Sequence, residues 1–200
     1  MKVYDFDNTI YDGDSTVDFV TWCLGTYPKT RKYFFPICFA CAGLGLHILS
    51  KDSFKAKLYR FLGDVPDTEK AAADFWEGHR KNIQKWYLDQ KEPGDLIISA
   101  SPEFLLRPVA EELGVSLIAS PVDKDTGKLL GPNNSNEVKV KRFTEKYGDG
   151  MDAGASMADL IEEFYSDSDD DLPMARLAAK AYKVKKGAVR PWTGIQRKRR

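Results

Sequence analysis

The second half of the chain alternates short apolar runs with helical patterns, and this alternation restricts the fold more than any other feature. The pattern is typical of a parallel sheet whose strands are joined by helical crossovers. We expect strands near residues 95–99, 116–120, 161–166 and 181–184, together with a short apolar strand at residues 2–4. The sequence therefore predicts an α/β fold with a Rossmann-like parallel sheet core and helices on both faces.

Two of the predicted crossover helices carry recognisable end signals. Ser101 is expected to cap one helix with Pro102 at its first position, and Gly114 to end it. Asn136 is expected to cap another helix that runs to Gly148.

Two carboxylates, Asp5 and Asp7, follow the first strand directly and are separated by one residue. Because side chains alternate in an extended segment, both can point toward the same side, where a hard cation and a phosphoryl group could sit. One carboxylate can then attack while the other carries a proton. Taken alone, the Asp-x-Asp-x-Thr run at residues 5–9 fits a solvated turn equally well.

Three later segments add to this pair. The apolar run at residues 96–98 ends at Ser99, Lys139 lies in the first turn of a predicted helix, and residues 164–165 lead into an acidic cluster from Asp167 to Asp171. With these four elements in this order, the sequence resembles the haloacid dehalogenase-like (HAD) hydrolase superfamily, and within it the phosphoserine-phosphatase-like branch, subfamily IB, which has a helical cap. The resemblance spans nearly the whole chain. All four segments fall at the carboxyl ends of strands or on the helix start that follows, where ligands bind in open sheets.

The resemblance implies a magnesium-dependent phosphatase that works through an aspartyl-phosphate intermediate. Asp5 would be the nucleophile, and Asp7 would protonate the leaving oxygen and then activate water. Mg²⁺ would be held by hard oxygen ligands, namely Asp5, the backbone carbonyl of Asp7, and Asp167. Dehalogenation is disfavoured because it requires neither Asp7 nor magnesium. A non-catalytic phosphate-binding protein is the other class of function, and the intact pair of carboxylates argues against it.

The resemblance also assigns residues to the phosphoryl group and to its support. The phosphate-binding residues would be Thr9, Ser99, Ala100 through its amide, and Lys139. Lys139 would add its charge to the amide dipole of a helix start, although without the motif order it reads as an ordinary surface lysine. Asp171 would orient Lys139 or the metal waters. Asp170 stands where this branch often has Asn, and it places an additional negative charge beside the phosphate.

Residues 15–91 read differently, because every pattern in this segment is helical. Ser15 is expected to cap the first helix, a second covers about residues 29–49, Ser50 caps a third, and a long fourth starts at Pro66 and Asp67. We therefore predict a catalytic core of residues 1–14 and 92–200 and an inserted helical cap of residues 15–91.

Charge and cysteine content limit the function classes. The 30 basic and 30 acidic residues balance, which removes any global argument for nucleic-acid binding. The chain has three cysteines, Cys23, Cys38 and Cys41; this odd number argues against a disulfide framework, and we interpret them as packing residues. Because the first motif begins at Asp5, no signal peptide is expected, and the protein is predicted to be cytoplasmic. The small residues of 148–157 predict a flexible loop, and residues 196–200 a solvated basic tail.

Two features bear on the identity of the substrate, namely Asp14 and one apolar run. By resemblance to phosphoserine phosphatases, Asp14 is placed to contact an amino group, as in phosphoserine, phosphoethanolamine or phosphocholine; the alternative is a hinge turn. Residues 33–49 contain no Asp, Glu, Lys or Arg. This run can rest on a membrane surface, peripherally, and present a phosphatidylglycerophosphate-type lipid to the site. The alternative, which we favour, is a buried cap helix or a dimer contact, and the oligomeric state is left open.

Overall fold

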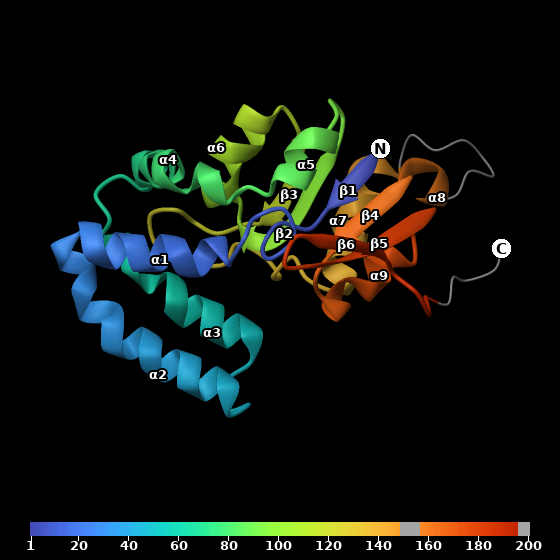
Figure 1. The fold of residues 1–200 in the computed structure, drawn as a ribbon. Coiled ribbons are helices and arrows are strands. Elements are labelled where there is room, and N and C mark those ends of the chain that lie inside the picture. The colour runs from blue at the N-terminus through green and yellow to red at the C-terminus, as the bar shows by residue number, and fades with distance from the viewer. Residues whose placement is uncertain (149–156, 196–200) are drawn as a thin grey trace.

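The computed structural model describes residues 1–148 and 157–195 of the 200-residue chain. A sheet occupies one side of the molecule, and a group of helices extends from it on the other (Figure 1). The expected flexible loop falls largely on residues 149–156 and the basic tail on residues 196–200, and both lie outside the described residues.

Six strands form one sheet in the order β3-β2-β1-β4-β5-β6. Their bounds are β1 Lys2–Tyr4, β2 Leu96–Pro102, β3 Ser116–Ser120, β4 Glu163–Ser166, β5 Lys180–Lys185 and β6 Ala188–Pro191. All neighbours are parallel except β5 and β6, which are antiparallel. The α/β fold class and the first five strands are confirmed. The sequence pattern does not predict β6, because all of its residues are exposed and no apolar alternation marks it.

The helical elements pack on the sheet or extend from one side of it (Figure 1). In chain order they are α1 Ser15–Thr26, the 3-10 helix η1 Pro28–Tyr33, α2 Phe34–Gly45, α3 Lys51–Leu58, η2 Tyr59–Asp64, α4 Thr68–His79, η3 Arg80–Asn82, α5 Lys85–Gln90, α6 Glu103–Leu113, α7 Glu137–Tyr147, α8 Met157–Leu160, η4 Asp169–Asp171 and α9 Leu172–Ala175. All of the elements between residues 15 and 91 are helices, as the pattern predicts. The division into core and cap stays a prediction.

Strand side chains alternate between two apolar clusters, one on each face of the sheet. On one face, Val3 and Phe164 pack with Phe143 of α7 and with α9. On the other face, Tyr4 and Tyr165 stack with ring centroids 4.9 Å apart and join the cluster that contains α4, α5 and α6. Since successive residues of a strand face opposite ways, this alternation buries both faces and leaves the carboxyl ends of the strands for polar groups.

Two expected helices are interrupted. The run expected to form one helix over residues 29–49 is η1 followed by α2. The long helix that begins after Asp67 stops at His79, because the next backbone groups bond to the loop after β1 instead. Asn82 O accepts from the Asp12 amide, and the Gln84 amide donates to Ile10 O, both at 2.8 Å. These bonds attach the helical segment to the loop that carries Asp5 and Asp7.

Helix starts also differ from three expectations. Asp14, and not Ser15, caps α1, because its extended backbone lets its carboxylate accept from the Val17 amide at 3.0 Å. Ser101 does not cap α6, since it lies within β2 and the N-cap position is Pro102. Asn136 occupies the N-cap position of α7 with a φ of 51° and makes no side-chain capping bond. The expected cap Ser50 and the Gly114 helix end are confirmed, and α4 begins where expected, with Asp67 as its N-cap.

The apolar run at residues 33–49 is exposed, so the expectation of a buried cap helix is wrong. In α2 only Ile37 and Ala40 are buried. Cys38 and Cys41 are likewise exposed, and only Cys23 packs inside. Across residues 1–148 and 157–195, no helix is both long and apolar enough to cross a membrane.

Candidate active site

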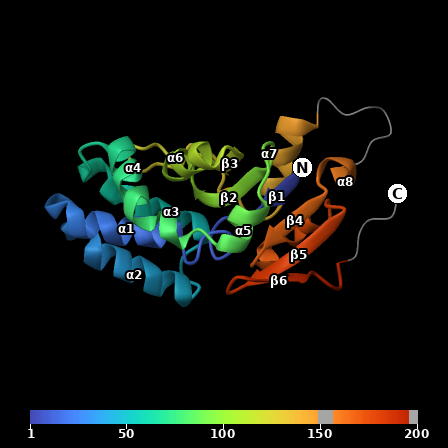
Figure 2. The ribbon, with the colours of Figure 1, turned by 45° about the horizontal axis from the view of Figure 1, so that its top comes forward.

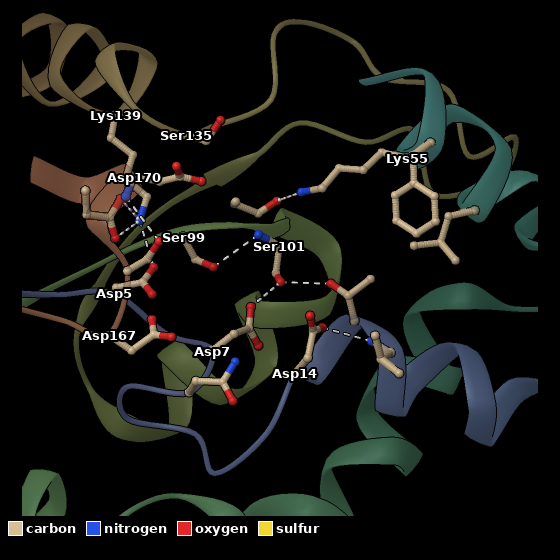
Figure 3. A pocket seen from close by; sticks show the side chains of 18 residues that line it. Asp5, Asp7, Asp14, Lys55, Ser99, Ser101, Ser135, Lys139, Asp167 and Asp170 are labelled. Carbon is tan, nitrogen blue, oxygen red and sulfur yellow. Dashed lines mark hydrogen bonds and ion pairs between the residues drawn. The ribbon is translucent and has the colours of Figure 1, made fainter. Parts of the chain in front are cut away.

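The loop after β1 is folded tightly around one carbonyl oxygen. Phe6 O accepts from the amides of Ile10 and Tyr11, each at 3.0 Å, and the side chains of all three residues are buried. Asn8 takes a positive φ of 55°, a conformation that Asn tolerates better than most residues. The loop therefore holds Asp5 and Asp7 at the carboxyl end of β1, where both line one cavity of about 240 Å³ (Figure 3).

Asp5 and Lys139 form a buried ion pair in this cavity. Lys139 Nζ lies 2.7 Å from Asp5 Oδ1 and 2.9 Å from Asp171 Oδ2, and Lys139 is 2% exposed. Asp171 Oδ2 also accepts from the Ser166 hydroxyl at 2.7 Å, which fixes the carboxylate. The structure thus brings together the expected Asp5, Lys139 and Asp171, which are contributed by the loop after β1, the first turn of α7 and η4.

Burial and neighbouring charges shift the pKa values of Asp5 and Lys139. Removal from water raises the pKa of Asp5 to about 8, against the opposing attraction of Lys139. Burial disfavours the Lys139 ammonium, but Asp5 and Asp171 outweigh it and raise the pKa of the lysine. Lys139 therefore remains a cation, and the raised pKa of Asp5 indicates that further positive charge would stabilise its carboxylate form.

Thr9 links Asp5 to Asp167. Its hydroxyl lies 3.5 Å from Asp5 Oδ2 and 3.4 Å from Asp167 Oδ1, and it accepts from the Asp167 amide at 3.0 Å. Thr9 is fully buried behind the cavity, with its hydroxyl on the two carboxylates. This geometry favours a positioning role for Thr9 over the expected direct contact with a phosphoryl group.

The expected metal ligands lie on one side of the cavity, where Figure 3 shows Asp5 and Asp167 close together. Burial raises the pKa of Asp167, as it does for Asp5, so a cation between them would relieve an electrostatic cost. Within the described residues, no three Asp, Glu, His or Cys side chains form a metal-binding group. A metal here would therefore use two carboxylates and complete its shell with a backbone carbonyl, phosphate and water. Such an all-oxygen donor set fits Mg²⁺.

Asp7 is oriented by two donors. The Ser101 hydroxyl donates to Asp7 Oδ2 at 2.5 Å, and the Ser15 amide donates to Oδ1 at 2.7 Å. Burial, together with the nearby charge of Asp14, raises the pKa of Asp7 to about 6. A carboxyl group with this pKa can both give and take a proton near neutral pH.

The carboxyl end of β2 forms the floor beside Asp7. The pairing register between β2 and β3 shifts between Ile98 and Pro102, and this irregularity turns Ser99 and Ala100 toward the cavity. The Ser99 hydroxyl accepts from the Ser101 amide at 3.1 Å. Both expected phosphate-binding positions therefore line the cavity, at the level of Asp5.

Helical residues close the opposite side. Asp14 and Thr16 of the α1 start line the cavity together with Phe54, Lys55 and Leu58 of α3. Lys55 Nζ donates to Ala100 O at 2.5 Å and to Asn133 Oδ1 at 2.6 Å, so a cation of the predicted cap contacts the predicted core. Asp14 and Asp170 also line this cavity, and both residues are exposed.

Sequence reasoning missed two of these residues. Lys55 is one of several lysines in a helical segment without a motif, and only the approach of α3 to β2 distinguishes it. For Ser101 the sequence predicts a helix cap, but its position two residues after Ser99 in a strand indicates that the two side chains lie on the same side.

Comparison with known proteins agrees with the fold. A family model described as haloacid dehalogenase-like hydrolase matches residues 3–176, a range that includes every motif residue discussed above. No curated protein sequence matches the chain.

Three solved structures are similar at low sequence identity. A protein of unknown function from Bordetella pertussis Tohama I has a TM-score of 0.75 and 18% identity, over 90% of this chain and 87% of that one. A HAD family hydrolase from Salmonella enterica serovar Typhi has a TM-score of 0.63 and 15% identity, over 88% and 59%. A probable phosphoserine phosphatase from Vibrio cholerae has a TM-score of 0.60 and 14% identity, over 90% and 55%. The chain thus spans little more than half the length of the last two.

Proposed function

Because this chain belongs to the haloacid dehalogenase-like hydrolase family, we propose that it hydrolyses phosphate monoesters with Asp5 as the nucleophile. The observation that carries the proposal is the pairing of Asp5 with Lys139 at 2.7 Å, next to an Asp7 carboxyl that two donors hold in place. A nucleophile with a bound cation and a second carboxyl oriented for proton transfer is what this chemistry requires.

In the first step, an oxygen of Asp5 attacks phosphorus and the bond from phosphorus to the leaving oxygen breaks. Asp7 gives its proton to that oxygen, so the product leaves as a neutral alcohol and the phosphoryl group stays on Asp5. Lys139 holds Asp5 Oδ1 and partly balances the negative charge that gathers on the phosphoryl oxygens. Ser99 and the Ala100 amide bind another of these oxygens from the β2 side.

In the second step, Asp7 takes a proton from water, and the water oxygen attacks phosphorus. The bond between phosphorus and Asp5 breaks, which releases phosphate and restores both carboxyl groups. Asp5, the Asp7 carbonyl and Asp167 would hold Mg²⁺, which when bound supplies positive charge to the phosphoryl oxygens. The Thr9 hydroxyl holds the Asp5 and Asp167 carboxylates in position to bind the metal.

A small phosphometabolite fits the cavity of about 240 Å³. Asp14 on one side supports recognition of an amine, as in phosphoethanolamine, phosphocholine or phosphoserine. Lys55 lines the opposite side of the cavity, where its ammonium group donates to Ala100 O and Asn133 Oδ1, and this positive charge supports recognition of an anionic group of the substrate. A substrate with both an amine and a carboxylate, such as phosphoserine, uses both residues.

The test is magnesium-dependent phosphate release by wild type and Asp5→Asn over phosphoserine, phosphoethanolamine, phosphocholine and nucleotides. Wild type should release phosphate and Asp5→Asn should lose at least about 1,000-fold in rate, because the covalent intermediate cannot form. Asp12→Asn, an exposed carboxylate of the same loop, is the matched control and should keep full activity. Retained turnover in Asp5→Asn would refute the mechanism, and no release from any substrate would favour a non-catalytic phosphate-binding protein.

Two variants separate the substrate candidates. Lys55→Met should raise KM for phosphoserine about tenfold or more and leave KM for phosphoethanolamine near the wild-type value. Asp14→Asn should raise KM for both. If neither variant changes the preference, the amine and carboxylate assignments are wrong while the phosphatase proposal stands.

A second candidate substrate is the phosphate of a lipid of the phosphatidylglycerophosphate type. The exposed apolar surface of α2 favours it, since this helix precedes the one that contributes Phe54, Lys55 and Leu58 to the cavity. Dispersed lipid in the same panel decides between the two candidates, because the lipid should then be hydrolysed faster than the soluble esters.

A further inference from the structure

Helix α2 carries an unusually exposed apolar surface. Phe35 is 69% exposed and Phe39, one helical turn later, is 76% exposed. Leu46 and Ile48, which follow the helix, are 70% and 73% exposed, and Phe34 is 51% exposed. Figures 1 and 2 both show α2 at the edge of the molecule, and Figure 1 shows α3 beside it. Apolar side chains gathered in this way on one element mark an interaction surface.

Positive charge surrounds this surface, although the chain as a whole is neutral. We call residues 28–60, which contain η1, α2 and α3, the α2–α3 hairpin. It contains seven basic residues and one acidic residue, Asp52, so the rest of the chain carries six more acidic than basic residues. The charge asymmetry is therefore concentrated on the same segment as the exposed apolar side chains.

A cavity of about 550 Å³ lies within the hairpin and combines both properties. Its walls include Tyr33, Phe39 and Leu49, and its cations are Lys32, Lys57 and Arg60. Lys32 is paired with Asp64 at 2.9 Å. Lys57 and Arg60 have no acidic partner among the residues that the structure describes, so their charges are available to an anion from outside.

Different residues of α3 line the two cavities. Lys55 lines the candidate active site and Lys57 lines the hairpin cavity. Two residues along an α-helix are about 200° apart, which explains how neighbouring lysines serve different surfaces. Changes to Lys57 or to the outer face of α2 can therefore be made without touching the catalytic residues.

We propose that the α2–α3 hairpin docks onto the surface of a phospholipid bilayer that contains anionic lipids. The exposed side chains of α2 enter the boundary between headgroups and acyl chains, while Lys57 and Arg60 bind lipid phosphates from the hairpin cavity. A second copy of this chain fits the surface less well, because two hairpins packed face to face would bring their cations together. Docking in this way does not depend on the reaction that the protein catalyses.

Vesicle flotation with the full chain tests the proposal. Wild type should float with vesicles of phosphatidylcholine containing about one third phosphatidylglycerol, and at least about tenfold more lipid should be needed for phosphatidylcholine alone. Binding should weaken as salt is raised, because the headgroup charges are screened. Phe35→Ser/Phe39→Ser and Lys57→Gln/Arg60→Gln should each require at least about tenfold more lipid than wild type.

Matched controls keep the result interpretable. Leu88→Ser/Leu130→Ser changes two exposed apolar residues, 44% and 67% exposed, outside the hairpin and should float like wild type. All variants should keep the wild-type rate of phosphate release from a soluble ester and the wild-type circular dichroism. The proposal is overturned if wild type does not float, or if both hairpin variants float as well as it does. It is also overturned if light scattering shows a wild-type dimer that Phe35→Ser/Phe39→Ser converts to a monomer, since a second copy then covers the surface.

Discussion

Ser101 gives the most direct test of how the site controls Asp7. Its hydroxyl donates to Asp7 Oδ2 at 2.5 Å and also bonds to Thr16 Oγ1 at 2.8 Å, so Ser101→Ala removes both contacts. The Ser15 amide still donates to the other oxygen, Oδ1, so Asp7 loses one of its two restraints.

The expected size follows from the type of bond that is lost. A hydrogen bond to a charged group contributes about 1.5–3 kcal/mol. If this energy is lost from the transition state, kcat/KM falls roughly 10- to 150-fold, since about 1.4 kcal/mol corresponds to a factor of ten. The Ser101 hydroxyl also lowers the pKa of Asp7 by stabilising its carboxylate. The limb of the pH profile that reports Asp7 should therefore move to higher pH in the variant.

The assay is phosphate release measured over pH, with Thr16→Val as the control. This substitution removes the second contact of Ser101 and leaves the bond to Asp7, so activity should stay within about threefold of wild type. The reasoning fails if Ser101→Ala keeps wild-type kcat/KM and an unmoved pH profile. It fails equally if Thr16→Val produces the same loss, because the effect would then come from the contact between α1 and β2.

Three other substitutions test the buried charges, the metal site and the backbone. Lys139→Met leaves Asp5 and Asp171 without their shared cation. Breaking such a buried pair costs about 3–5 kcal/mol, which lowers Tm by roughly 6–20 °C for a chain of this size. Thermal unfolding measures this loss, and Lys141→Met, at an exposed lysine, is the control that should change Tm little. Asp167→Asn should weaken Mg²⁺ binding at least about tenfold, seen both in activity and in the Tm increase that Mg²⁺ produces, and an unchanged Tm response would exclude Asp167 as a ligand. Gly127→Ala should destabilise by about 2–4 kcal/mol in denaturant unfolding, because φ is +71° and the new Cβ would lie 2.0 Å from Tyr59 O. Gly94→Ala, with φ +94° and no atom within 4 Å, should cost less, and equal costs would show that the contact is unimportant.

Much of the site can be predicted from the sequence because its residues lie at strand ends and at a helix start. Asp5 and Asp167 each follow a strand directly, Ser99 follows the apolar residues 96–98 within β2, and Lys139 lies in the first turn of a helix. Parallel strands end at the same edge of a sheet, so local position along each strand predicts a common location. The structure places all four residues in one cavity.

The parts that the sequence could not predict depend on contacts between distant segments. Adjacent cap-type residues such as Asp14 and Ser15 compete, and only the backbone angle of the loop decides between them. The interruption after His79 arises from bonds to a loop about 70 residues earlier, and the approach of Lys55 to Ala100 links segments 45 residues apart. The apolar composition of the α2 run also favours burial. Whether another surface covers the run cannot be predicted from its composition.

The position of β1 in the sheet has a consequence for synthesis of the chain. β1 is the first strand made, yet it lies between β2, which is separated from it by more than 90 residues, and β4, which is made about 160 residues later. Pairings between such distant segments form slowly. Until β4 emerges from the ribosome, one edge of β1 has no partner, and Asp5 has neither Asp167 nor Asp171 beside it. The proposed catalytic centre is therefore among the last parts of the molecule to be completed, and a chain interrupted before residue 160 would carry the proposed nucleophile, Asp5, without Asp167 and Asp171.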